Sequence, residues 1–154
     1  PVLRKDFTVN SYMIYQAKAM GASAVLLICS VLEDGRLKAY HQLAEELGLS
    51  ALVETHSEEE ILRAQKIGAK IIGVNNRNLK DFTVDINNSI RLRELVSPEV
   101  VFVSESGIRG VEDMKALYEN GTDAVLIGEL LMRKAYRKTA LLELMQQTVR
   151  KKHA

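Results

Sequence analysis

The sequence has little of several features that mark specialised classes of protein. It contains one cysteine, Cys29, among 154 residues, which excludes an internal disulfide and is typical of a reducing, cytoplasmic location. Its 21 basic and 20 acidic residues give a net charge of +1, whereas a general nucleic-acid binder carries a stronger basic bias. Its longest apolar runs have the length of a strand, far below a membrane span. We therefore expect no nucleic-acid partner and no membrane partner.

The overall composition is that of an ordinary globular protein. Hydrophobic residues make up 47% and charged residues 27% of the chain, which excludes collagen-like, low-complexity and disordered classes. The length predicts a single domain over 1–154, and no linker or shift in composition divides it. The sequence begins at Pro1, directly in an apolar strand-like run. We expect it to be an excerpt of a longer chain.

One repeat, a glycine followed by a short apolar run, recurs along the chain. It is present at 21–28, 68–74 and 121–127, with a looser copy at 48–53. Glycine is the usual residue just past the end of a helix, and a continuous apolar run suits a parallel strand that is buried on both faces. Each copy therefore predicts the end of a helix followed by a buried strand.

The pattern predicts six strand–helix units. The predicted strands lie near 1–5, 24–29, 50–54, 70–75, 99–104 and 123–127, and the predicted helices near 10–20, 33–47, 57–67, 87–96, 110–120 and 136–150. Strict alternation favours a parallel sheet with right-handed crossovers, which fits an open doubly wound sheet or a (β/α)₈ barrel. No glycine-rich nucleotide-binding loop follows any strand. The predicted fold class is α/β, a TIM (β/α)₈ barrel with six of its eight units.

Polar side chains gather at the predicted strand ends, and their positions favour the barrel. In these folds the active site lies at the carboxyl ends of the strands. The strand bodies are almost purely apolar, whereas their ends carry Arg4-Lys5-Asp6, Cys29-Ser30, Glu54, Asn75-Asn76-Arg77, Ser104-Glu105-Ser106-Gly107 and Gly128-Glu129.

These residue types can do chemistry on a polar substrate. A lysine in such a mouth can protonate or polarise a carbonyl, or form a Schiff base. A nearby glutamate can take a proton and help to keep the lysine charged. Arg77 suits either a substrate carboxylate or a salt bridge that orients Glu54 or Glu105. Asn75 and Ser106 can orient hydroxyl groups.

The last two strand ends carry a glycine followed by the start of a helix, at 106–108 and 128–130. Glycine lets backbone N–H groups approach an anion closely, and the field of a helix N-terminus favours negative charge. In barrels the phosphate site is commonly built from the final two strand loops. We therefore expect a phosphorylated small-molecule substrate.

Other polar residues favour structural interpretations. The three histidines and the single cysteine show no metal-ligand spacing, so no metal site is predicted. His41 lies on the apolar stripe of its helix, where outer-face packing is expected. His56 is expected on the loop surface rather than in the mouth. Ser57 and Glu60 predict a capping box at the start of the third helix.

Five segments resemble indole-3-glycerol phosphate synthase. They are Pro-Val-Leu-Arg-Lys-Asp-Phe at 1–7, Leu-Val-Glu-Thr-His at 52–56, Ile-Gly-Val-Asn-Asn-Arg-Asn-Leu at 72–79, Val-Ser-Glu-Ser-Gly-Ile at 103–108 and Leu-Ile-Gly-Glu-Leu-Leu-Met-Arg at 126–133. The resemblance implies a barrel lyase of tryptophan biosynthesis that needs no cofactor. Such an enzyme closes the indole ring of 1-(2-carboxyphenylamino)-1-deoxyribulose 5-phosphate, with loss of carbon dioxide and water.

The resemblance also assigns roles, position by position. Lys5 matches the general-acid lysine of the family, and Glu54 matches the glutamate that acts as general base in the dehydration. The other matching positions are implied to contact the substrate: Asn75, Arg77, Glu105 and Ser106 along its body, and Gly107, Gly128 and Glu129 around its phosphate.

Two departures from the family keep alternatives open. The family usually has a serine where this chain has Leu130, and its first two strand–helix units are absent. A complete barrel takes roughly 250 residues. The alternatives to a working synthase are a non-catalytic fragment that keeps the fold and phosphate binding, and a different phosphate-binding barrel isomerase. We expect self-association, or a separately supplied segment, to cover the open edge strands.

Overall fold

A single sheet of six parallel strands organises the chain. The computed structural model describes residues 1–78 and 81–146. The strands pair in sequence order, so that each strand neighbours the next along the chain. They are β1 (Leu3–Arg4), β2 (Ala24–Ile28), β3 (Ser50–Thr55), β4 (Ile71–Asn75), β5 (Val101–Glu105) and β6 (Ala124–Leu126).

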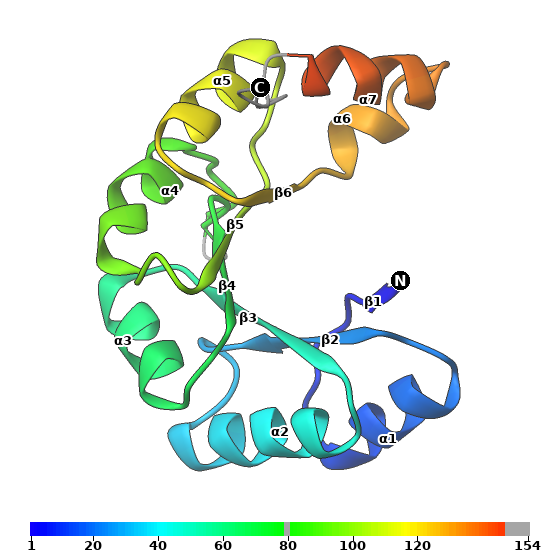
Figure 1. Ribbon diagram of the computed structural model, residues 1–154, viewed down its shortest axis with the longest axis vertical. Helices are drawn as coiled ribbons and strands as arrows, with labels where there is room; N and C mark the ends of the chain where they lie inside the picture. Colours follow the sequence, from blue (N-terminus) through cyan, green and yellow to red (C-terminus); the bar gives the residue numbers. More distant parts are fainter. Residues whose placement is uncertain (79–80, 147–154) are drawn as a thin grey trace, which may run out of the picture.

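The helices lie on the convex side of this curved sheet (Figure 1). They are α1 (Ser11–Ala19), α2 (Asp34–Glu46), α3 (Glu58–Lys66), α4 (Asn87–Leu92) with the 3₁₀ turn η1 (Arg93–Leu95), α5 (Val111–Glu119), α6 (Glu129–Met132) and α7 (Arg137–Met145). A doubly wound sheet reverses its strand order and carries helices on both faces. Sequential order with helices outside is the winding of a TIM barrel, so the predicted fold class is confirmed.

Alternation along the strands separates two apolar layers. Val25 and Leu27 of β2 face the helices, in a core that includes Leu37 of α2 and Phe102 of β5. Leu26 and the other residues on the opposite side pack along the concave face. Successive side chains of a strand point to opposite faces, so this alternation also decides which strand-end residues point inward.

The glycine repeat has the predicted structural role. Gly21, Gly48, Gly68 and Gly121 all have positive φ, between 65° and 82°, and each follows the last turn of a helix. Glycine adopts this left-handed conformation without a steric penalty. The repeat therefore marks four of the five places where a helix ends and the chain turns back into the sheet, the exception being the connection from η1 to β5.

Several boundaries differ from those predicted. β1 is limited to Leu3–Arg4, because it pairs with β2 alone and at two positions. The predicted helix at 87–96 is divided into α4 and η1, and α6 was not predicted. The last predicted helix ends at Met145 within the described residues, and positions 147–150 of that prediction lie outside them.

The two edge strands β1 and β6 each have one neighbour in the sheet of the described residues. Figure 1 shows them at the two ends of the curve. The expectation that a second copy or a further segment covers these edges stays a prediction. No helix in 1–78 or 81–146 is long and apolar enough to cross a membrane.

Candidate active site

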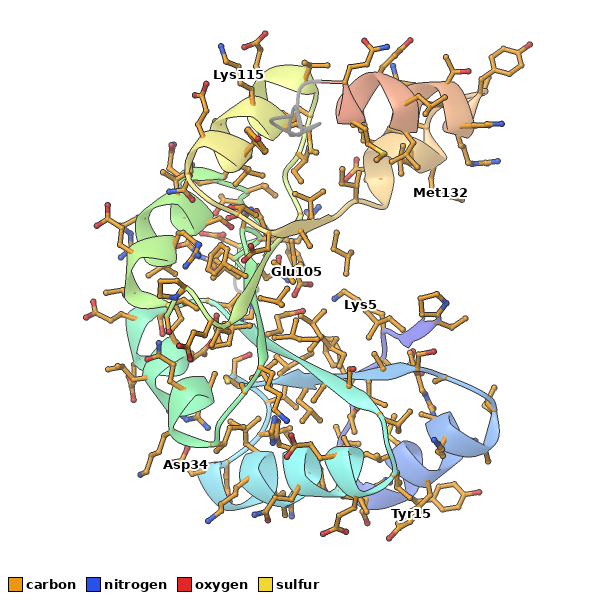
Figure 2. All side chains as sticks on the ribbon, in the orientation of Figure 1. Lys5, Tyr15, Asp34, Glu105, Lys115 and Met132 are labelled. Atoms are coloured by element: carbon orange, nitrogen blue, oxygen red, sulfur yellow. The ribbon has the colours of Figure 1, made fainter. Side chains whose placement is uncertain are left out.

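The pleat of the sheet turns one set of strand-end residues toward the concave side. Leu3, Leu52 and Val103 lie in the concave apolar layer, and side chains two residues further along a strand return to the same face. Lys5, Glu54 and Glu105 are therefore aimed into the interior of the curve from β1, β3 and β5. Figure 2 shows Lys5 and Glu105 pointing toward each other across this space.

The ammonium of Lys5 is shared between two buried carboxylates. Its Nζ lies 3.1 Å from Oε2 of Glu54 and 3.2 Å from Oε2 of Glu105. The Lys5 side chain is 35% exposed, whereas those of Glu54 and Glu105 are 3% and 1% exposed. The lysine is thus the member of this cluster, here called the lysine–carboxylate cluster, that a molecule entering from solvent meets.

The cluster shifts the pKa of two of its members. Burial alone would lower the pKa of Lys5, but the negative charges of Glu105 and Glu54 outweigh it, so that this pKa lies above its ordinary value. Burial, together with the charge of Glu54, raises the pKa of Glu105 to about 7, against the opposing charge of Lys5. The cluster therefore holds a charged proton donor beside a carboxyl group that titrates near neutral pH.

Asn75 joins the cluster, and Arg77 does not. The side chain of Asn75 donates from Nδ2 to Oε1 of Glu54 at 3.1 Å, while its Oδ1 accepts from the backbone N–H of Arg77 at 3.0 Å. Of the two roles expected for Arg77, the salt bridge to Glu54 or Glu105 is contradicted, and contact with a substrate carboxylate stays a prediction. The guanidinium of Arg77 instead lies 3.5 Å from Oε2 of Glu129, because the turn after β4 directs it toward the β6 end.

A pocket lies beside the lysine–carboxylate cluster, at the ends of β5 and β6. It encloses about 550 Å³ and is lined by Arg77, Val84, Ser106, Gly107, Ile108, Arg109, Leu126, Ile127, Gly128, Glu129, Leu130 and Arg133. The structure thus brings the residues predicted to surround phosphate into one pocket, here called the glycine pocket. Arg109 and Arg133 are additional cations that the sequence interpretation did not single out.

The backbone of the glycine pocket is unusual. Ser106 and Gly107 have φ of 65° and 82°, and the left-handed conformation is uncommon for serine. A Cβ on Gly107 would also press against Val84. Glu129, predicted at the phosphate, is paired with Arg77 and with Arg133, the latter at 3.0 Å. Its carboxylate is thus a counter-ion for these two arginines, and phosphate contact by Glu129 stays a prediction.

A buried polar network fixes the loop between the two halves of the site. The side chain of Asn76 donates to Oγ of Ser104 at 3.0 Å and to the carbonyl of Ser106 at 3.1 Å, and it accepts from Oγ of Ser89 at 2.8 Å. Asn76, Ser89 and Ser104 are each at most 3% exposed. The network ties β4 to β5 and α4, and so it places Asn75 and Ser106. The network was not predicted, because Asn76, Ser89 and Ser104 follow no periodic sequence pattern.

The structure also corrects the prediction for His56. Its side chain is only 17% exposed and its Nε2 lies 3.5 Å from Oε1 of Glu54, so it faces the cluster rather than the loop surface. Half of the predicted capping box forms, because Oγ of Ser57 accepts from the N–H of Glu60 at 3.3 Å. The carboxylate of Glu60 accepts instead from the backbone N–H of His56, at 2.7 Å.

No group of three or more histidine, cysteine, aspartate or glutamate residues that could hold a metal ion occurs in the described part of the chain. His41 is buried on α2, as its place on the apolar stripe predicted. Cys29 is buried as well, and burial raises the pKa of its thiol to about 12. Cys29 lies in the core that faces the helices rather than in the concave layer.

These features define a partial TIM barrel with a lysine–carboxylate cluster and a glycine pocket at the carboxyl ends of its strands. Solved structures support the fold. 3-Hexulose-6-phosphate synthase from Salmonella typhimurium superimposes with a TM-score of 0.80 at 16% identity, covering 96% of this chain and 72% of that one. KGPDC from Streptococcus mutans does so with a TM-score of 0.73 at 13% identity, covering 90% of this chain and 66% of that one.

Sequence comparison gives the family. The family model described as indole-3-glycerol phosphate synthase matches residues 1–144, and the chain belongs to this family. The indole-3-glycerol phosphate synthase of Leuconostoc mesenteroides is 57% identical over 144 residues, which are 94% of this chain and 55% of that protein. The indole-3-glycerol phosphate synthase of Ruminiclostridium cellulolyticum is 59% identical over 133 residues, which are 86% of this chain and 51% of that protein. The chain spans about half the length of the curated relatives it matches.

Proposed function

We propose that this site closes the indole ring of 1-(2-carboxyphenylamino)-1-deoxyribulose 5-phosphate, releasing carbon dioxide and water, in the cytoplasm. The observation that carries the proposal is the ammonium of Lys5, which is shared between Glu54 and Glu105 at the mouth of the barrel beside a pocket suited to phosphate. Family membership supports the same reaction. The proposal covers a carboxy-lyase activity that needs no cofactor.

Lys5 has the state that the first step requires. In this step the aromatic carbon that bears the carboxylate attacks the ketone carbon, and the ketone oxygen takes a proton from Nζ of Lys5. The raised pKa of Lys5 keeps this ammonium charged near neutral pH, and a positive donor aimed at a developing alkoxide stabilises the transition state. Loss of carbon dioxide then restores the aromatic ring.

Glu54 performs the second step. The new hydroxyl leaves as water, and Glu54 removes the proton that the forming double bond releases. Its carboxylate is held at Oε2 by Lys5 and at Oε1 by Asn75, both at 3.1 Å, so the base is fixed before the substrate arrives. The proton that Glu54 removes is passed to the departing hydroxyl, which leaves as water, and Lys5, having lost its proton to the ketone oxygen, recovers one from solvent.

The glycine pocket receives the phosphate. Ser106, Gly107 and Gly128 line it, while Arg77 supplies a planar cation for the phosphate or for the substrate carboxylate. The ion pair from Arg77 to Glu129 is 3.5 Å long and partly exposed, so an arriving dianion displaces it at little cost. Glu105 and Ser106 orient the sugar portion between the two halves of the site.

Two measurements on this chain test the proposal together. We expect fluorescence of the indole product from the carboxyphenylamino-deoxyribulose phosphate, and protection against thermal unfolding by inorganic phosphate. Protection without turnover would leave a phosphate-binding, non-catalytic fragment. Turnover of a different sugar phosphate, with none of this substrate, would indicate a barrel isomerase instead.

A further inference from the structure

His56, in the turn after β3, connects two carboxylates that lie on opposite sides of its ring. Its Nε2 is 3.5 Å from Oε1 of Glu54, inside the cluster, and its Nδ1 is 3.2 Å from Oε2 of Glu60, outside it. None of the roles assigned above uses this histidine. Its ring nitrogens nevertheless span the distance from the proposed general base to the first turn of α3.

Glu60 fixes the orientation of the imidazole. Its Oε2 accepts from the backbone N–H of His56 at 2.7 Å and also contacts Nδ1. Glu60 is itself anchored, because its own N–H donates to Oγ of Ser57 at the start of α3. Backbone and ring of His56 are thus held by one carboxylate. A proton on Nδ1 is consequently directed toward Glu60, and a proton on Nε2 toward Glu54.

The Nε2 atom of His56 is buried and has no hydrogen-bond partner in the described residues. Buried polar atoms are nearly always hydrogen-bonded, so an exception calls for a physical reason. The Glu54 carboxylate, 3.5 Å away, lies a few tenths of an ångström beyond ordinary hydrogen-bond length. Hydrogen bonds of catalytic groups are often long in the free enzyme and shorten when the substrate binds.

We propose that His56 is a positioning residue for Glu54, whose Nε2–H closes on Oε1 of that carboxylate when substrate enters, with Glu60 holding the ring. This inference rests on the proposed function, because it gives Glu54 its role as base. Lys5 holds Oε2 of Glu54, and Asn75 donates to Oε1, the oxygen that His56 also approaches. His56 completes the set that fixes the carboxylate while it removes a proton.

The charges around His56 favour the imidazolium form that this role needs. His56 lines a cavity together with Glu60, Arg77 and Asp85. The charged groups around its ring are Glu54 and Glu60 in contact with it, Glu105 behind Glu54, Arg77 and Asp85 along that cavity, and Lys5 and Arg63 beyond the two carboxylates. Burial lowers the pKa of His56, but the hydrogen bond and charge of Glu60, with the charges of Glu54 and Glu105, raise it above its ordinary value.

Two substitutions separate positioning of Glu54 from a purely structural role. In His56→Gln the amide nitrogen stands near the former Nε2, so the contact with Glu54 is kept and that with Glu60 is lost. In His56→Asn it stands near the former Nδ1, so the reverse holds. We expect His56→Gln to keep most of the turnover, and His56→Asn to lower kcat about ten- to a hundredfold with KM little changed, as for a lost hydrogen bond to a charged group. The reverse order would overturn the proposal.

A second readout does not depend on turnover. The imidazole of His56 is titrated by NMR in the unmodified chain, in Glu54→Gln and in Glu60→Gln. We expect both variants to lower the pKa of His56. The matched control is Glu45→Gln, which removes the carboxylate 3.7 Å from His41 on α2 and should leave the His56 titration unchanged.

The titration also settles the mixed outcomes. If both His56 variants keep full turnover, the positioning role is overturned. If both lose turnover, or if the chain shows none, the effect of Glu54→Gln on the pKa of His56 decides. A lowered midpoint supports the coupling of His56 to Glu54 even where the proposed reaction itself fails. An unchanged midpoint overturns it, whatever the activity of the chain.

Discussion

Gly73 on β4 leaves the space that the carboxylate of Glu105 fills from the neighbouring strand β5. A Cβ on Gly73 would overlap Oε1 of Glu105 and would lie 3.1 Å from Cδ1 of Leu52. The absence of a side chain at position 73 is thus required for the lysine–carboxylate cluster to form, although Gly73 contributes no reactive group. Glycine within a strand often marks such a close approach.

Gly73→Ala should therefore disturb the cluster. The added methyl group must displace a carboxylate that is 1% exposed, so we expect a loss of about 1–3 kcal/mol in the free energy of unfolding. The control is Gly35→Ala on α2, where a Cβ meets nothing within 4 Å and alanine favours the helix. Urea unfolding of both variants checks this, and an unchanged Gly73→Ala variant would contradict the packing described.

Glu105 should make the stability of the fold depend on pH in a defined direction. Its pKa is raised from 4.5 to about 7 in the folded chain, so the folded state binds more protons than the unfolded state between these values. Its contribution to stability is complete below about pH 4.5 and is lost as the pH rises to about 7.

Glu105→Gln removes this titration while keeping the shape of the side chain. The fall in unfolding free energy between about pH 4.5 and 7 should therefore be smaller in this variant. Glu119→Gln, at an exposed position on α5, is the control and should follow the unmodified chain. Parallel profiles for Glu105→Gln and the unmodified chain would show that Glu105 does not titrate in this range.

Much of the architecture was predictable from the sequence because its signals are local. The glycines past the helix ends, the continuous apolar strands and the polar strand ends indicated the barrel winding and placed Lys5, Glu54 and Glu105 together. The partner of Arg77 was not predictable, because the turn after β4 that aims it at Glu129 has no periodic pattern. The burial of His56 was not predictable for a related reason. It depends on how α3 packs against the sheet, and the residues near position 56 do not determine that packing.

Asn76 should contribute more to stability than to direct chemistry. Asn76→Ala removes the amide partner of the buried backbone N–H of Ser89, while the hydroxyls of Ser89 and Ser104 keep their hydrogen bond to each other. An unsatisfied buried group costs about 1–3 kcal/mol. We expect a clear fall in the urea midpoint, together with weaker binding of inorganic phosphate because the carbonyl of Ser106 is released. Normal phosphate affinity in a destabilised variant would show that the Asn76 network does not shape the glycine pocket.

Leu130→Ser should strengthen phosphate binding. Leu130 lines the glycine pocket at the position where the family usually has serine, and a hydroxyl there adds a hydrogen bond to the anion, worth about 1.5–3 kcal/mol at best. Titration with inorganic phosphate followed by ³¹P NMR measures the change, with Leu130→Ala as the control for lost bulk. Equal affinities of the serine and alanine variants would show that the phosphate does not approach position 130.

Lys5 should supply the proton that allows ring closure. The most direct test of this role is the rate of indole-product fluorescence for the unmodified chain, Lys5→Ala and Lys70→Ala, the last removing an exposed lysine that pairs with Glu45 at 2.8 Å, away from the cluster. We expect turnover in the unmodified chain and in Lys70→Ala, and its loss in Lys5→Ala. Turnover that survives in Lys5→Ala, or an unmodified chain no faster than that variant, would contradict this role.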